Sequence, residues 1–262
     1  MVTKIYPPSP PFHSLRLATA ADIPRMAELS VLGFKDSEIF RFERPGYENF
    51  PHDAIASFAN LYRSQLQDPR VVAIVAEEAP RPDDTTHFQP PHHDATLVGR
   101  VVVGVASWVL PEGSSRTGQF VVPGVGDPEP APDRDLCQRR LDLFTGAKEA
   151  TEKKSVILPV NSVLSKKVDS NLYRYLSGKM ICDKLVVHPS YQQRGHGTAM
   201  LRWGLSLCNR DGVDQGVIPS HVGEPVYLYM GYKVVGEMEV PDDGDVEGFT
   251  QRVVVYESKQ RN

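Results

Sequence analysis

Cysteine is scarce in this chain, and long apolar or basic runs are absent from it. The 262 residues include three cysteines, Cys137, Cys182 and Cys208, whose number and separation exclude a disulfide framework and a paired-cysteine metal site. No apolar run approaches the length that spans a bilayer, and the proline-rich beginning lacks the apolar segment of a signal peptide. We therefore expect a cytoplasmic protein that is not inserted in a membrane.

Charge of one sign does not dominate either. Lys and Arg number 29 against 33 Asp and Glu, which gives a net charge of -4, and the basic residues are scattered. Nothing in this pattern favours binding of nucleic acid. His87, His92 and His93 fall in a proline-rich loop without the cysteine or carboxylate spacing of a metal site, so no metal is expected.

Length and local composition indicate one domain with insertions. Hydrophobic residues make up 40% of the chain, enough for a sizeable core. Residues 1–13 contain four prolines and are expected to form a flexible N-terminal arm. Residues 14–262 are expected to form a single domain with insertions at about 77–95 and 111–178, where proline, glycine and polar residues accumulate.

Hydrophobic periodicity predicts a mixed α/β or α+β sheet. Thr19 and Asp22 form a capping-box pattern at the start of the first helix. The aromatic stretch 34–51 has no regular pattern and is expected to be irregular. The predicted strands are 14–18, 71–76, 96–110, 180–187 and 216–218, and the predicted helices begin at 19, 53, 133 and 197, with another one through Tyr229 before a final hairpin.

The most informative segment is residues 183–198. An apolar strand ends at Pro189, and a turn containing Gly195 and Gly197 opens directly into an amphipathic helix. A helix N-terminus presents unpaired N–H groups and the positive end of its dipole, and glycines allow a phosphate to approach these donors closely. The segment therefore predicts an anion site that suits a phosphate or pyrophosphate.

Two nucleotide-binding alternatives do not fit this segment. A Walker A loop ends in Gly-Lys-Ser/Thr, whereas Gly197 is followed by Thr198 and Ala199. A dinucleotide-binding fingerprint needs a third glycine, and Met200 stands there. An ordinary strand-to-helix turn would be the better interpretation if the glycines stood alone. Gln192 three residues before Gly195, directly after a Leu-x-Val-x-Pro strand, makes the pattern much more specific.

That combination resembles motif A of the GNAT superfamily of N-acetyltransferases. The resemblance continues from Ser220 through Gly223, Tyr227 and the Gly-aromatic pair at 231–232, and it includes the first strand and helix cap at 15–23. It implies a central mixed, mostly antiparallel sheet flanked by helices. In that fold the strands around 181–187 and 216–219 splay apart to form a cleft for acetyl-CoA, and no metal is needed.

The resemblance also implies roles for individual residues. Backbone groups of Leu185, Val186 and Val187 are expected to pair with the pantetheine arm as if it were an added strand. The residues expected at the pyrophosphate are Gln192, Gln193, Arg194, Gly195, His196, Gly197 and Thr198. Ser220 and Gly223 stand where the family has asparagine and alanine, which weakens that part of the cofactor contact.

The same resemblance suggests how protons move during the reaction. Tyr227 matches the tyrosine that protonates the departing thiolate. Asp183 occupies a strand position where some members carry a base, although a normal Asp titrates near ~3.9, so a hydrogen-bonded structural aspartate is an equal alternative. His221 ranks next as a base and His188 after it. The aromatic stretch 34–50 lies where the acceptor binds in the family, with simple core packing as its alternative.

These observations predict direct transfer of an acetyl group from acetyl-CoA to a primary amine of a small molecule. Two alternatives remain open. The acceptor could be a protein N-terminus or a lysine, or the chain could be a catalytically silent coenzyme A-binding module. Tyr227 favours an enzyme. Both a monomer and a homodimer are compatible with the sequence.

Overall fold

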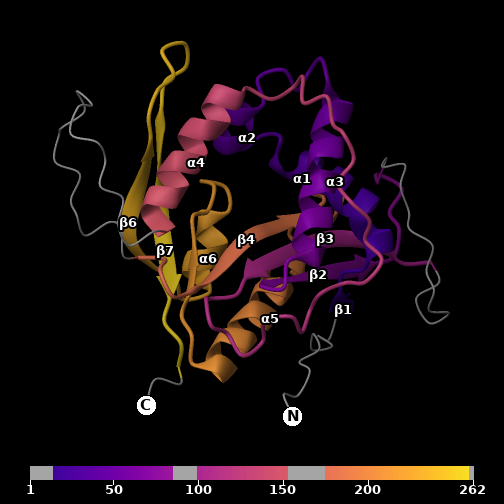
Figure 1. The fold of residues 1–262 in the computed structure, drawn as a ribbon. Coiled ribbons are helices and arrows are strands. Elements are labelled where there is room, and N and C mark those ends of the chain that lie inside the picture. The colour runs from indigo at the N-terminus through magenta and orange to yellow at the C-terminus, as the bar shows by residue number, and fades with distance from the viewer. Residues whose placement is uncertain (1–13, 85–98, 153–174, 260–262) are drawn as a thin grey trace.

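The sheet has seven strands, and Figure 1 shows it crossing the centre of the molecule. A computed structural model describes residues 14–84, 99–152 and 175–259 of the chain. The strand order is β1-β2-β3-β4-β5-β7-β6, and every neighbouring pair is antiparallel except β4 and β5. The strands are β1 (Ser14–Leu17), β2 (Val71–Glu78), β3 (Val101–Val109), β4 (Met180–Val187), β5 (Gln215–Val217), β6 (Lys233–Val240) and β7 (Phe249–Tyr256).

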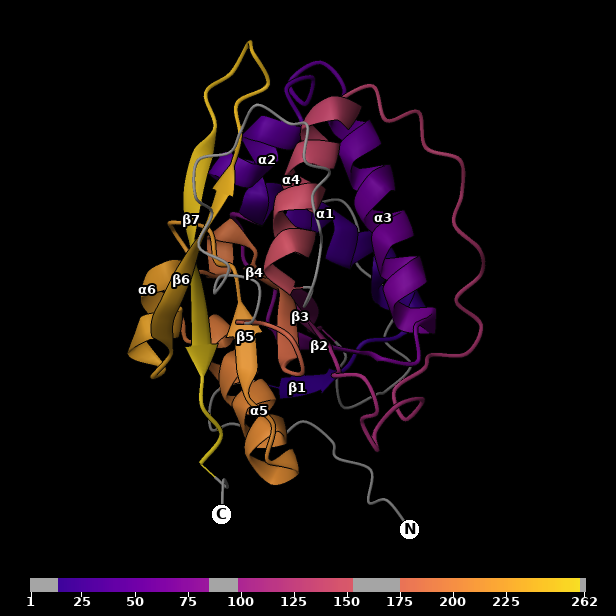
Figure 2. The same ribbon diagram turned by 60° about the vertical axis from the view of Figure 1, so that its left-hand side comes forward.

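Helices cover both faces of this sheet. On one face α1 (Ile23–Phe34) and α3 (Pro51–Gln67) pack against β2, β3 and β4, and on the other face α5 (His196–Asp211) packs against the same strands. The remaining helices are α2 (Glu38–Glu43), α4 (Gln138–Glu152) and α6 (Glu224–Tyr229). Helix α4 contacts α2 and β6, and Figure 2 shows it standing beside α2. The mixed, mostly antiparallel sheet flanked by helices is the fold expected from the sequence.

Strands β4 and β5 part after a short parallel contact. Only Met180 with Gln215 and Ile181 with Gly216 are paired, although β4 continues to Val187. On its other edge β4 pairs with β3 as far as Gly104 and Val187. The edge of β4 that faces β5 therefore opens after Ile181, as predicted for a cofactor cleft.

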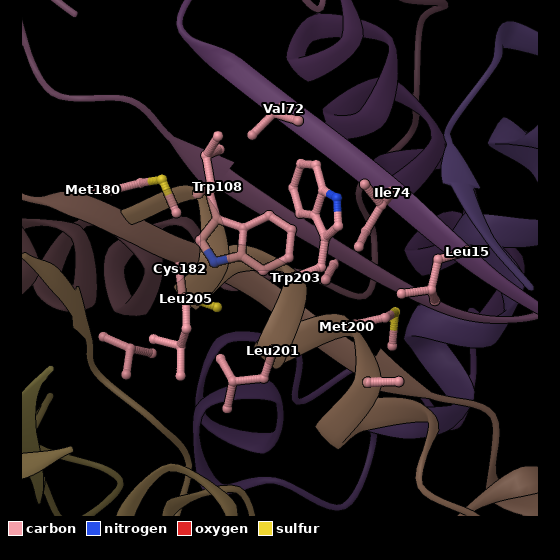
Figure 3. Close-up of a cluster of buried hydrophobic side chains, with 14 of the residues drawn as sticks. Leu15, Val72, Ile74, Trp108, Met180, Cys182, Met200, Leu201, Trp203 and Leu205 are labelled. Atoms are coloured by element: carbon pink, nitrogen blue, oxygen red, sulfur yellow. The ribbon is translucent and has the colours of Figure 1, made fainter. Parts of the chain in front are cut away.

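Two tryptophans fill the core between the sheet and α5. Trp108 of β3 and Trp203 of α5 have ring centroids 5.5 Å apart, and both side chains are buried (Figure 3). The Trp108 indole N–H donates to Gln215 Oε1 of β5 at 3.2 Å. Aromatic pairs of this kind stabilise beyond their buried area, so the core fixes α5 against the strands that line the cleft.

The capping pattern at the first helix is confirmed. Asp22 accepts hydrogen bonds from the Thr19 backbone and hydroxyl, each at 2.8 Å, and the Arg16 guanidinium also pairs with it. Since N-caps satisfy the orphan N–H groups of the first turn, this pattern could be identified from the sequence alone.

The expectation that residues 34–51 are irregular is wrong in part, because they contain α2. The Ser37 hydroxyl oxygen caps this helix by accepting a hydrogen bond from the Phe40 N–H at 3.3 Å. The side chains of Phe40 and Phe42 are buried in two different hydrophobic clusters. Six residues are too few to show helical periodicity in a sequence. The helix depends on its cap and on burial against elements far along the chain.

The segment before α4 is packed on the domain. It runs along α3, where Val122 N–H donates to Leu66 O at 2.9 Å and, nearer α4, Arg134 pairs with Asp53 at 2.8 Å. Helix α4 begins at Gln138, later than predicted, because Asp135 is held by Arg44 at 2.5 Å and accepts a backbone bond from Gly46. The N-terminal arm and the three loop histidines lie outside the described residues.

Candidate active site

A cavity of about 230 Å³ opens where β4 and β5 part. Its walls come from β4, the loop after β5, α6, the α1–α2 region and α4, so it joins the cleft to the helical side of the domain. The lining residues are Phe34, Ser37, Ile39, Phe40, Glu43, Phe58, Phe144, Lys148, Leu176, Ile181, Cys182, Asp183, Lys184, Leu185, Val217, Ile218, Pro219, Ser220, Gly223, Val226 and Tyr227. Most of this wall is apolar or aromatic, and its charged groups are few.

Tyr227 of α6 places its hydroxyl in this wall. The side chain is 5% exposed, and its hydroxyl lies 3.6 Å from the Cys182 sulfur of β4. Burial, and then the neighbouring Cys182, raise the pKa of the Tyr227 phenol well above its ordinary value near 10. The phenol therefore carries a proton across the whole working range of an enzyme, which is the state that a proton donor requires.

Cys182 itself is unsuited to be a nucleophile. Burial raises the pKa of its thiol to about 12. A thiol with such a pKa stays protonated near neutral pH, and the thiolate is the reactive form. Cys182 is best described as a buried neighbour of Tyr227.

Asp183 is held by three donors from three elements. Its carboxylate accepts hydrogen bonds from Gln65 at 2.7 Å, from Lys148 at 2.9 Å and from Lys184 at 2.9 Å. Burial alone would raise the pKa of this carboxyl, but the charges of Lys184 and Lys148 and their hydrogen bonds hold it well below its usual range. A carboxylate in this state accepts a proton poorly near neutral pH. The contacts of Asp183 therefore fit a hydrogen-bonded structural aspartate better than a general base.

The turn expected to bind the pyrophosphate, residues 192–198, follows the far end of β4. From Cys182 to Val187 the strand rises roughly 16 Å, at about 3.3 Å per residue. Gly195, the residue before α5, has φ 86°, and Gln193 has φ 59°, so the turn uses the left-handed region twice. This conformation aims the first N–H groups of α5 out of the helix end, where an anion is stabilised.

Glu78 of β2 anchors this turn from behind. Its carboxylate accepts from Arg194 Nε at 3.0 Å and lies 2.6 Å from the Nε2 of the buried His196. Burial raises the pKa of Glu78, but hydrogen bonds from Arg194 and His196 outweigh it and lower the pKa overall. His196 therefore contacts the turn from the protein side, whereas Arg194 is half exposed at its rim.

A second buried group supports the beginning of the turn. The Tyr191 hydroxyl donates to Asp84 Oδ2 at 3.1 Å, and the Arg25 guanidinium pairs with the same carboxylate at 2.6 Å. His188 packs beside them, with its Nε2 3.5 Å from Asp84 Oδ1, and burial lowers its pKa. His188 therefore has a structural position and does not line the cavity.

Comparison with known proteins decides the family. No protein-family model matches the chain. It is 60% identical over 255 residues to an acetyltransferase of Stachybotrys chartarum, and the match covers 97% of this chain and 95% of that relative. The chain is a GNAT-family acetyltransferase.

Solved structures share the fold of this acetyltransferase. One, described as histone acetyltransferase HPA2 and related acetyltransferase from Corynebacterium glutamicum, has a TM-score of 0.54 and 15% identity, with 96% of this chain and 99% of that chain covered. Another is the putative arylalkylamine N-acetyltransferase 7 of the yellow fever mosquito, with a TM-score of 0.53, 12% identity, and 94% and 87% covered. At these identities the likeness concerns the fold alone.

The other residues predicted for the cofactor lie on β4, at the start of α5 and in the turn before α6 of the acetyltransferase. Leu185 lines the cavity, the Val186 side chain is buried on the α1 face, and the Val187 carbonyl accepts from Gln192 Nε2 at 3.2 Å. Gly197 and Thr198 belong to the first turn of α5. The turn before α6 is closed by Ser220, whose Oγ accepts from the Gly223 N–H at 3.2 Å.

His221, the second candidate for the base, lies outside the cavity of the acetyltransferase. Its side chain is 64% exposed, and its Nδ1 is 3.1 Å from Glu38 Oε1. The loop that carries Ser220 and His221 turns the histidine toward the surface. His221 is therefore not placed to take a proton from a group in the cavity.

Glu43, Lys148 and Lys184 are charged cavity residues that the sequence did not point to, and Glu43 is the carboxylate among them. It ends α2 and lines the same cavity as Tyr227 and Asp183. Burial raises the pKa of the Glu43 carboxyl, even though the charges of Lys184, Arg44 and Lys148 act to lower it. No sequence motif marks this residue, because its burial depends on β4 and α4, which are distant in the chain.

Among residues 14–84, 99–152 and 175–259, no group of three or more His, Cys, Asp or Glu side chains is arranged to hold a metal ion. Within the same ranges no helix combines the length and apolar character needed to cross a bilayer.

Proposed function

We propose that this acetyltransferase moves the acetyl group of acetyl-CoA directly to the primary amine of a small molecule. Acetyl-CoA is a substrate of this reaction and enters through the gap between β4 and β5. The observation that carries the proposal is the cavity of about 230 Å³, which continues from this gap and is walled by aromatic side chains.

The size and lining of the cavity support a small acceptor with an apolar body. Pockets for drug-sized ligands usually occupy about 300–1,000 Å³, so this one suits a smaller molecule. Phe34 and Phe58 stack with ring centroids 6.2 Å apart, and Phe40 lies 6.4 Å from Phe58. Apolar rings of this kind bind an apolar or aromatic group, and the few polar groups then orient the amine.

The gap and the turn support acetyl-CoA as the donor. The free edge of β4 from Cys182 onward offers backbone groups to a pantetheine arm, and the start of α5 offers N–H groups to a pyrophosphate. A thioester at the near end of this path meets Tyr227 and Cys182. Tyr227 then donates its proton to the departing sulfur, and holding both reactants in one cavity supplies much of the acceleration.

A thiol-release assay tests this function. We expect acetyl-CoA turnover that is stimulated by small apolar or aromatic amines, with 2-phenylethylamine as the first probe, and calorimetric binding of coenzyme A. Peptides with a free N-terminus and peptides with an internal lysine form the comparison set. Greater stimulation by peptides than by every small amine would overturn the small-molecule acceptor, and coenzyme A binding without any stimulated release would favour the silent module.

A further inference from the structure

We propose that Glu43 is the general base that takes the proton from the acceptor amine, and that Asp183 is a positioning residue. This inference rests on the proposed function. The two carboxylates line the same cavity but make different contacts, and these contacts are the basis for giving them different roles.

Glu43 is fixed at the end of α2 while its carboxylate stays available. Its backbone carbonyl accepts a hydrogen bond from the Cys137 N–H at 2.8 Å, which holds the end of the helix. Within the described ranges, the Glu43 carboxylate takes part in no hydrogen bond or ion pair with another side chain. Glu43 is partly buried, and a carboxylate that lines a cavity without a side-chain partner is satisfied best by a donor from a bound molecule.

The cations that face Glu43 are committed to other carboxylates. Lys184 of β4 and Lys148 of α4 both donate to Asp183 at 2.9 Å. Arg44, next to Glu43, pairs with Asp135 at 2.5 Å and donates to Ser57 at 2.8 Å. The ammonium group of an acceptor is therefore the natural partner of Glu43.

Asp183 differs from Glu43 in each of these respects. It is saturated by Gln65, Lys148 and Lys184, and its pKa is lowered, whereas the pKa of Glu43 is raised by burial. When two carboxylates of one site have pKa values moved in opposite directions, the one with the raised pKa has the greater affinity for a proton.

The proton balance of the step is simple. The acceptor ammonium first gives one proton to solvent, and the neutral nitrogen then attacks the thioester carbonyl carbon. The new N–C bond forms, the C–S bond breaks, the second nitrogen proton passes to Glu43, and the sulfur takes the Tyr227 proton. Solvent then removes the proton from Glu43 and returns one to Tyr227, leaving an amide and coenzyme A.

The test compares Glu43→Gln with two other variants in the full-length protein. The acceptor is 2-phenylethylamine, or whichever amine stimulates thiol release most in the assay described above. Removal of a general base lowers kcat by about 10²-fold or more, so we expect this loss in Glu43→Gln together with loss of the acidic limb of the kcat–pH profile. Glu43→Asp, which keeps a carboxylate, should retain the limb and part of kcat. Glu48→Gln, at an exposed position, should match the wild type.

Calorimetric affinity for coenzyme A should be unchanged in all three variants, which shows that they fold. Glu43→Gln with kcat within threefold of the wild type and an intact acidic limb would overturn the role of Glu43 alone. If Asp183→Asn loses the limb and Glu43→Gln keeps it, the assignment is reversed. Absence of amine-stimulated turnover in the wild type would instead overturn the proposed function, and the base with it.

Discussion

The Asp183 carboxylate lies 2.9 Å from the Lys148 ammonium, and this pair joins helix α4 to strand β4 inside the cavity. At the other end of α4, Arg140 pairs with Asp243 in the hairpin between β6 and β7. Helix α4 is therefore attached to both sides of the gap. Its attachments determine how firmly one wall of the acceptor cavity is held.

Lys148→Met tests the first attachment. The change keeps an unbranched side chain but removes the ion pair, and since Lys148 is a third exposed we expect the free energy of unfolding to fall by only about 1 kcal/mol. Urea denaturation measures this loss, and hydrogen exchange should increase in α4. Lys233→Met breaks an exposed pair with Glu257 and should change stability by less than ~0.5 kcal/mol. Equal losses in both variants would contradict a special role for Lys148.

The pH dependence of stability tests Asp183. Its pKa is lowered in the folded state, so its contribution is fully present above the ordinary pKa of about 4 and is lost as the pH falls further. We expect Asp183→Asn to lower the free energy of unfolding by about 3 kcal/mol near neutral pH, because two lysines lose their shared partner. Urea titrations at several pH values should show this difference shrinking below about pH 4. A difference that stays constant down to pH 3 would exclude the lowered pKa.

Tyr227→Phe tests the proton donor. Removing the hydroxyl should lower kcat by about 10²-fold while coenzyme A still binds, because the ring keeps its packing against Tyr232. Since its pKa is raised well above 10, the phenol stays protonated below pH 10. Deprotonation of Tyr227 should therefore not lower the kcat of the wild type anywhere below pH 10. Tyr229→Phe, at a side chain 77% exposed, is the control and should leave kcat unchanged. A similar kcat in Tyr227→Phe and the wild type would assign proton donation to another group.

The fold could be predicted largely because its signals are local. The capping box at Thr19 and Asp22, the apolar run of β4 and the glycines before α5 each depend on neighbours in sequence. These signals are also those that carry the resemblance to the GNAT family. For this reason the strand, the turn and the helix start at the expected cofactor site could be anticipated, while binding of coenzyme A to them stays a prediction.

The acceptor side could not be anticipated, since its properties come from residues far apart in the chain. Gln65 reaches Asp183 across 118 positions, and Lys148 reaches it across 35. The burial that sets Glu43 apart requires α2 to form, and α2 is too short to be recognised by periodicity. The sequence alone does not distinguish the role of an aspartate in a strand from that of a glutamate among aromatic residues, because their roles depend on partners that are distant in the chain.

Gly195→Ala tests the turn at residues 192–198 that is expected to bind the pyrophosphate. With φ at 86° an added side chain is strained by about 1–2 kcal/mol, so we expect lower stability and weaker binding of coenzyme A. Gly146→Ala, in the middle of α4 where an added Cβ meets no atom within 4 Å, should instead stabilise the protein by up to about 1 kcal/mol. Denaturation and calorimetry measure both quantities. Unchanged coenzyme A affinity in Gly195→Ala would place the pyrophosphate elsewhere.

The brief pairing of β4 with β5 divides the sheet into two blocks, β1–β4 and β5–β7, joined in the sheet by two residue pairs. A pantetheine arm that pairs with the free edge of β4 makes the sheet continuous between the blocks. The donor substrate is then also a structural element, and its binding free energy adds to the free energy of unfolding. Since the cavity takes walls from both blocks, we expect its shape to depend on a donor bound at the proposed gap, so steady-state kinetics should show acetyl-CoA binding before the amine.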